Sequence, residues 1–130
     1  MTQFPGRTAL ALPMLMLFTG CGGEPAATSA APSAPAAVTQ CAACHTFEKD
    51  GPRRTGPNIH GIIGQVAGTR PGFTYSAALK NSGITWTPET LDAYITAPSK
   101  SVPGTRMGFT GEPDATKRKA IIAYIQSSAK

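Results

Sequence analysis

Apolar side chains are distributed unevenly along the chain, and the longest apolar run lies near its start. The run TALALPMLMLF extends from Thr8 to Phe18 and follows a single cation, Arg7. Its 11 residues are too few to span a bilayer as a helix and are typical of the hydrophobic core of an export signal. We therefore expect residues 1–20 to be a cleaved signal peptide.

The segment that follows has almost no apolar side chains. GGEPAATSAAPSAPAA, from Gly22 to Ala37, contains no large apolar residue and only one charge. Such a sequence cannot bury enough surface to offset the entropy of ordering its backbone. Together with Cys21 it predicts a flexible linker over residues 21–37, with the folded domain over residues 38–130.

Within that domain, apolar positions recur at helical spacing in short stretches. Thr87 followed by Pro88 is a helix-start signal, and Leu91, Tyr94 and Ile95 then fall on one face before Pro98 stops the pattern. The spacing predicts a helix from Thr87 that ends before Pro98.

Three further helices are predicted from similar patterns. Pro113 opens the last one, in which the cationic run 117–119 should face solvent. Its buried side should be formed by Ile121, Ile122, Tyr124 and Ile125. Shorter helices are expected over Cys41–Phe47 and near Ser76–Asn81, so the fold class is all-α.

Composition narrows the fold class further. The 130 residues include 14 Gly and 12 Pro, and 41% are hydrophobic, which disfavours an all-β sandwich or a bundle of long helices. A small, loop-rich domain needs disulfide bonds or a bound cofactor to stabilise its fold. The three cysteines cannot all pair within one chain, and their spacing does not resemble that of a disulfide-bonded domain. A bound cofactor is therefore the expected stabilising element.

The sharpest chemical signal is Cys41-Ala42-Ala43-Cys44-His45. Two cysteines three apart lie on one face of a helical turn and can each bond a vinyl group of a haem, while the next residue directs its imidazole to the iron. A thioredoxin-like redox pair would need a βαβ context. A zinc site would need further ligands, but the only other histidine is His60. The pattern predicts one covalent haem c held by Cys41 and Cys44, with His45 on the iron.

Met107 is the candidate for the second iron ligand. It is the only methionine left once residues 1–20 are removed, and it lies in the turn-rich loop PGTRMGF. A thioether is a soft, neutral ligand that favours ferrous iron and raises the reduction potential. The alternatives are a packing role for Met107 and ligation by His60, for which we expect a surface role instead.

From Cys41 to Ile125 the chain resembles the class I cytochromes c, within them the mitochondrial-type proteins and their bacterial relatives. The motifs that carry the resemblance are Cys41–Thr46, Thr55–Gly61, Gly72–Tyr75, Gly83–Trp86, Pro103–Met107 and Ile121–Ile125. The resemblance implies short helices wrapped around one haem. It also implies single-electron transfer between larger redox complexes.

The resemblance assigns roles to further residues. It implies that the Pro57 carbonyl accepts a hydrogen bond from the proximal imidazole. The hydroxyl of Tyr94 should point at the methionine sulfur, and Phe109 should cover the exposed haem edge. Partners for a haem propionate are implied at Tyr75, Trp86 and Thr105. For each aromatic residue, ordinary core packing is the alternative.

Departures from the family pattern carry expectations of their own. Gln65 and Leu79 stand where relatives have an arginine and an asparagine near the buried propionate, and the lost cation predicts a lower potential. Ser33 and Ala37 stand where mitochondrial relatives have a glycine and an aromatic residue. The N-terminal helix should therefore be short or missing.

The sequence before the linker resembles a bacterial lipoprotein signal. Leu17-Phe18-Thr19-Gly20-Cys21 has small residues before a cysteine that would become the acylated N-terminus. The alternative is an ordinary signal peptide and a stray thiol, which would leave a soluble periplasmic protein. We expect an exported protein anchored through Cys21 on the periplasmic side of a bacterial membrane.

These inferences converge on a monomeric, membrane-tethered monohaem electron carrier that is not an enzyme and cycles between Fe(II) and Fe(III). The expected partners are redox proteins such as a cytochrome bc1-type complex, a terminal oxidase or a dehydrogenase, with no nucleic acid. Two alternatives stay open. One is a haem peroxidase or ligand sensor in which Met107 dissociates, and the other is a fixed cytochrome subunit of an oxidoreductase complex.

Overall fold

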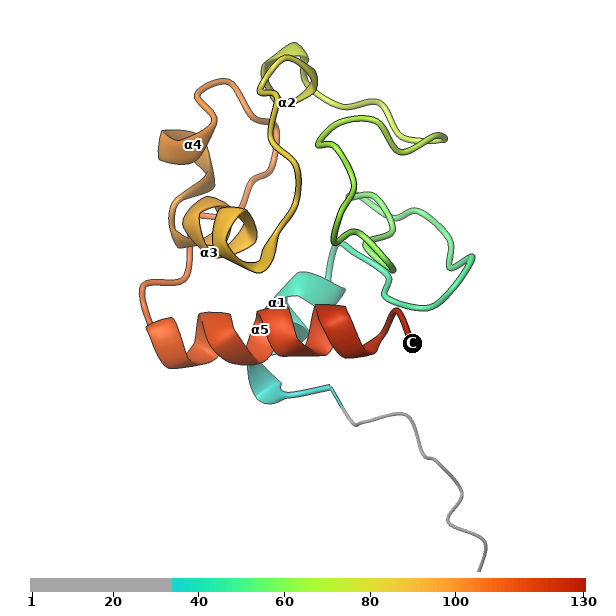
Figure 1. The fold of residues 1–130 in the computed structure, drawn as a ribbon, viewed down its shortest axis with the longest axis vertical. Helices are drawn as coiled ribbons and strands as arrows, with labels where there is room; N and C mark the ends of the chain where they lie inside the picture. The colour runs from blue at the N-terminus through green and yellow to red at the C-terminus, as the bar shows by residue number, and fades with distance from the viewer. Residues whose placement is uncertain (1–33) are drawn as a thin grey trace, which may run out of the picture.

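Five helices joined by long loops form the part of the chain that the computed structural model describes, residues 34–130 (Figure 1). They are α1 Ala36–Ala42, α2 Ala77–Lys80, α3 Pro88–Thr96, α4 Pro98–Ser101 and α5 Ala115–Ser127. Within this range, β pairing is limited to one isolated bridge between Val66 and Thr85. The predicted all-α class is confirmed. The expected signal peptide, Cys21 and residues 22–33 of the expected linker lie outside the described residues.

Helix α3 forms where the sequence predicted it. The Thr87 hydroxyl accepts the Thr90 N–H at 3.2 Å, and the Thr90 hydroxyl accepts the Thr87 N–H at 2.8 Å, so both ends of a capping box are made. Leu91, Tyr94 and Ile95 are buried, as their spacing predicted.

Helix α5 begins at Ala115, two residues after the predicted start at Pro113. The Asp114 carboxylate caps it by accepting the N–H groups of Thr116 at 2.8 Å and Lys117 at 3.3 Å. The predicted buried side is formed by Ile121, Ile122 and Ile125, with Tyr124 half-buried.

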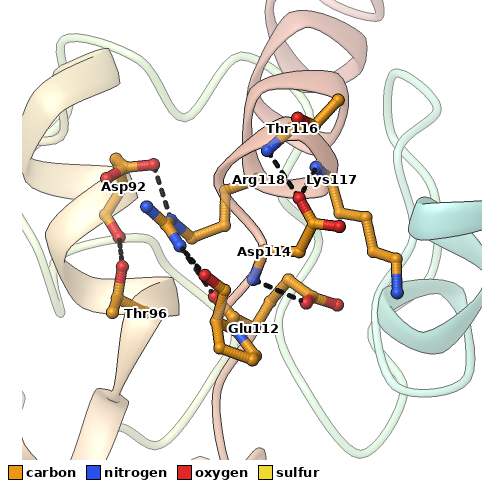
Figure 2. A network of polar contacts seen from close by, with 8 residues as sticks. Asp92, Thr96, Glu112, Asp114, Thr116, Lys117 and Arg118 are labelled. Carbon is orange, nitrogen blue, oxygen red and sulfur yellow. Dashed lines mark hydrogen bonds and ion pairs between the residues drawn. The ribbon is translucent and has the colours of Figure 1, made fainter.

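The prediction of a solvated cationic run on α5 is wrong for Arg118. Its Nε donates to the Asp92 carboxylate of α3 at 2.8 Å, and its Nη1 donates to the carbonyls of Glu112 at 3.0 Å and Pro113 at 2.9 Å (Figure 2). The two flanking lysines are exposed. Arg118 therefore ties α5 to α3 and to the segment that enters α5.

The helix predicted over 41–47 is shifted, because α1 ends at Ala42 and only its last turn contains Cys41. Beyond it, the Cys44 carbonyl accepts the Gly56 N–H at 2.8 Å and the Thr46 carbonyl accepts the Ile59 N–H at 2.9 Å. These carbonyls bond to the loop that follows rather than to the next helical turn, so the helix does not continue.

The N-terminal helix is present and short, as expected, but it begins at Ala36, two residues before the expected start of the folded domain at Val38. Val38 of α1 is fully buried and Ala37 packs against the core, and α1 lies against α5 (Figure 1). Ser33 lies outside the described residues.

Two single-turn helices complete the fold. Ser76 caps α2 by accepting the Leu79 N–H at 3.2 Å, in agreement with the predicted helix near Ser76–Asn81. Helix α4 was not predicted, since Pro98 was interpreted only as a stop signal. A proline in the first turn of a helix also starts one, and Pro98 does both.

The core lies between α1, α3 and α5 and the loops that wrap beside them. Ring pairs join these parts: Phe47 meets Tyr124 edge-on with centroids 5.2 Å apart, and Trp86 lies 5.1 Å from Tyr94. Among residues 34–130, none of the helices combines the length and apolar content needed to cross a bilayer.

Candidate functional site

One large cavity occupies the space between the helices and loops of the described domain. Its volume is about 730 Å³, within the range of about 300–1,000 Å³ typical of ligand pockets. All ten cofactor-binding residues proposed from the sequence line it: Cys41, Cys44, His45, Pro57, Tyr75, Trp86, Tyr94, Thr105, Met107 and Phe109. Residues spread over 69 positions of sequence thus meet at one site (109 − 41 + 1).

The imidazole of His45 is fixed by a hydrogen bond of 2.7 Å between its Nδ1 and the Pro57 carbonyl. Because a carbonyl only accepts, Nδ1 carries the proton and Nε2 presents its lone pair. Burial lowers the pKa of His45, and the bond to Pro57 partly offsets that effect. The neutral imidazole, which is the metal-binding form, is therefore favoured.

Gly56, directly before Pro57, lies against the imidazole of His45, a contact that sequence reasoning missed. A Cβ at this position would lie 2.4 Å from Cε1 and 2.7 Å from Nδ1 of the imidazole, so only glycine fits. The sequence signal was a glycine directly before Pro57, which was noted only as part of a motif.

The two cysteines lie beside the end of α1 with their thiols free. Cys44 is exposed and Cys41 is half-buried. The N–H groups of Cys44 and His45 both bond to the Cys41 carbonyl, at 3.1 and 2.9 Å. Burial raises the pKa of Cys41, with smaller contributions in the same direction from Cys44 and Glu112. Cys41 is therefore a neutral thiol near neutral pH, in the lining of the cavity.

Met107 lies half-buried in the cavity lining, on the loop between α4 and α5. The Thr105 hydroxyl accepts the Met107 N–H at 3.3 Å and shares a hydrogen bond of 2.7 Å with the Tyr94 hydroxyl. Burial raises the pKa of Tyr94, partly offset by this bond. The expected contact of the Tyr94 hydroxyl with the Met107 sulfur stays a prediction.

The other aromatic residues proposed from the sequence, Tyr75, Trp86 and Phe109, contribute rings and polar groups to the cavity lining. Trp86 is buried and Phe109 half-buried, while Tyr75 packs edge-on against Phe73 with centroids 4.9 Å apart. Burial raises the pKa of Tyr75, and the charge of Arg70 partly lowers it. Gln65 and Leu79, the positions that depart from the family pattern, line the same cavity.

His60 does not line the cavity. Its Nδ1 lies 3.0 Å from the Phe47 carbonyl, and the residue is half-buried. Among residues 34–130, no three His, Cys, Asp or Glu side chains cluster closely enough to hold a metal ion.

The residues that meet at the cavity fit a haem by their chemistry. Two cysteine thiols three residues apart, one imidazole with a free Nε2 and one thioether form the donor set, and apolar side chains form most of the lining. Hydroxyl and indole donors for carboxylates are present in the same lining.

Proteins of known identity are similar in sequence to this chain. No protein-family model matches the chain. It is similar to a cytochrome c homolog of Bradyrhizobium diazoefficiens, 50% identical over 71% of this chain and 50% of that protein, so the chain spans half of that relative. It is also similar to cytochrome c2 of Rhodopila globiformis, 48% identical over 68% of this chain and 83% of that protein.

A solved structure shows the same fold. Cytochrome cH from Methylobacterium extorquens superposes with a TM-score of 0.64 and 43% identity, over 70% of this chain and 91% of that one. The fold, the lining of the cavity and the sequence similarity thus point to the same kind of protein.

Proposed function

The chain belongs to the class I c-type cytochromes, in which one covalent haem c carries single electrons, and on that premise we propose which residues do the work. Cys41 and Cys44 form the thioethers, and His45 and Met107 bind the iron. The observation that carries this proposal is the meeting of these four side chains in one cavity.

The haem iron, when bound, cycles between Fe(III) and Fe(II) and so accepts and releases one electron. The protein positions the two proposed iron ligands, His45 and Met107. The Pro57 carbonyl fixes the tautomer of His45 and makes Nε2 a better donor. The Met107 thioether favours the ferrous state, and the Tyr94–Thr105 bond links α3 to the loop that carries it.

We propose that the protein is a carrier and not an enzyme. A Met107 that stays on the iron leaves no open position for peroxide or a diatomic gas. The relatives named cytochrome c and c2 support this assignment. The alternative of a peroxidase or ligand sensor requires Met107 to dissociate, and the experiment below separates the two.

The experiment is spectroscopic. The purified holoprotein should show a low-spin ferric spectrum with the sulfur-to-iron charge-transfer band, and Met107→Ala should lose that band while the haem stays covalently attached. His60→Ala, which alters the other candidate ligand, is the matched control and should leave the band unchanged. A high-spin parent spectrum would favour the enzyme or sensor instead.

We propose further that the protein works at the periplasmic face of a bacterial membrane, tethered through acylated Cys21, and exchanges electrons with membrane redox proteins. The support is the apolar run 8–18, the sequence LFTGC and the linker composition of residues 22–35, which precede α1. A tether raises the effective concentration of the carrier near such partners. Cys21→Ser should release the holoprotein from native membranes, and retention of the variant in the membrane fraction would contradict the anchor.

A further inference from the structure

Arg70 lines the haem cavity, although the sequence analysis gave it no role. It lies in the same lining as Gln65 and Tyr75. Its Nη1 donates to the carbonyl and the side-chain oxygen of Asn58, at 3.3 and 3.2 Å, and its Nη2 donates to the His60 carbonyl at 2.5 Å. Arg70 therefore lines the cavity, and the loop 58–60 holds its guanidinium in place.

The charge of Arg70 is not neutralised by these contacts. All three acceptors are neutral oxygens, and the one ion pair found within residues 34–130 joins Arg118 to Asp92. A guanidinium has five N–H donors, and these three contacts leave Nε–H available. A fixed, unpaired cation at the edge of a ligand cavity favours an anionic group of the ligand.

A haem brings two carboxylates into such a cavity, its propionates. Gln65, which stands where relatives have an arginine, provides no charge for them. We propose that Arg70 supplies the cation beside the haem propionates that Gln65 lacks, an inference that rests on the proposed haem site. A positive charge near the iron favours Fe(II) over Fe(III), so Arg70 raises the reduction potential.

A second observation indicates that the charge of Arg70 acts on other residues of the cavity lining. Arg70 lowers the pKa of the Tyr75 hydroxyl, partly offsetting the increase caused by burial. Tyr75 is one of the expected propionate partners, so the field of Arg70 acts on the part of the lining where the propionates are expected. The lower potential expected from Gln65 alone is therefore offset.

Arg53 provides a matched control. Its Nη1 donates to the Gly72 carbonyl at 2.7 Å, so it joins the same two loops as Arg70. Arg53 is exposed and does not line the 730 Å³ cavity. Its replacement removes an equal charge and a similar loop contact without removing a cation from the cavity.

The test is a potentiometric titration of the holoprotein and its variants. Arg70→Gln should shift the redox equilibrium toward Fe(III) by about tenfold, about 59 mV for one electron, while Arg70→Lys should keep most of the parent potential. Arg53→Gln should change little. Gln65→Arg combined with Arg70→Gln should return the potential to near the parent value.

The outcomes separate the possible roles. If Arg70 only clamps the loop 58–60, Arg70→Lys should shift the potential as much as Arg70→Gln does, and Gln65→Arg should not restore it. Either result, or an unchanged potential in Arg70→Gln, would overturn the proposal. If Arg70→Gln does not hold haem, Arg70→Gln and Arg70→Lys are compared in the Gln65→Arg background, where the proposal predicts a lower potential for Arg70→Gln than for Arg70→Lys and a clamp predicts equal potentials.

The proposed function is tested separately by the parent spectrum. A parent without low-spin, methionine-ligated haem would contradict the assignment of Met107 and with it the basis of this inference. A parent with that spectrum and an Arg70→Gln variant that titrates like it would overturn the role of Arg70 alone.

Discussion

The backbone of Gly56 lies against the imidazole of His45 so closely that a Cβ at residue 56 would fall 2.4 Å from Cε1. The Gly56 N–H donates to the Cys44 carbonyl at 2.8 Å, so this segment cannot move away without losing that bond. The Nδ1 atom of His45 forms a hydrogen bond of 2.7 Å with the Pro57 carbonyl. The position of the imidazole is therefore defined by backbone atoms of two consecutive residues.

Gly56→Ala should displace the imidazole and weaken its bond to iron. We expect a loss of stability of about 1–3 kcal/mol from the overpacked contact, together with a ferric spectrum that is partly high-spin. Thermal unfolding and absorption spectroscopy measure the two effects. Gly61→Ala is the control, because its added Cβ meets no atom within 4 Å and only its φ of 60° is unfavourable. That variant should lose stability but keep the parent spectrum.

Arg118→Ala should destabilise the fold without changing the haem site. It removes a partly buried ion pair with Asp92 and two hydrogen bonds to the carbonyls of residues 112 and 113, at a cost of about 2–4 kcal/mol (Figure 2). Asp92→Asn keeps an oxygen acceptor and should cost less than about 1 kcal/mol. Chemical denaturation gives both values. A changed reduction potential in Arg118→Ala would contradict a purely structural role.

Stability at acid pH should depend on Asp114. The N–H groups of Thr116 and Lys117 at the start of α5 hold the pKa of its carboxyl below its ordinary value of 3.8. A depressed pKa stabilises the folded state above the unfolded-state pKa, and this contribution is lost as pH falls through the lower folded-state value. Asp114→Asn should therefore match the parent near neutral pH and lose less stability below about pH 4. Unfolding midpoints across that range, with Asp50→Asn as control, measure the difference.

The sequence predicted which residues meet at the cavity better than it predicted the path of the backbone around them. The motif Cys41-Ala42-Ala43-Cys44-His45 predicts a haem site without any knowledge of the fold, and Met107 is the only methionine outside the expected signal peptide. The register of α1 was missed because its end is set by bonds from Gly56 and Ile59, which lie more than ten residues away along the chain. Local patterns contain no information about such contacts.

Arg118 and Arg70 were missed for a related reason. A cation in a charged run or in a loop is by default solvated, and only the folded chain shows which carbonyls surround it. Helix-capping residues, in contrast, can be recognised from the sequence, because their partners are local. The partners of Thr87 and Ser76 lie within three residues, so helices α3 and α2 were predicted at nearly their observed positions.

At high pH, Lys100 should replace Met107 on the ferric iron. Lys100 is exposed on α4, directly before the loop that carries Met107, and such a loop without helical structure opens more easily than the core. A deprotonated amine is a good donor to Fe(III). Arg106, next to Met107, stays protonated and donates to the Thr74 carbonyl, so it cannot compete.

Lys100→Ala should therefore move the loss of the ferric methionine band to higher pH or leave hydroxide as the incoming ligand. Arg106→Lys should move it to lower pH, because a second amine then lies beside Met107. Lys119→Ala, on the exposed face of α5, is the matched control and should titrate like the parent. The measurement is a titration of that band from neutral pH to about pH 11, with the incoming ligand identified by electron paramagnetic resonance. Amine ligation that persists unchanged in Lys100→Ala would show that another lysine reaches the iron, and the loop before Met107 would then be more mobile than its hydrogen bonds to Thr105 indicate.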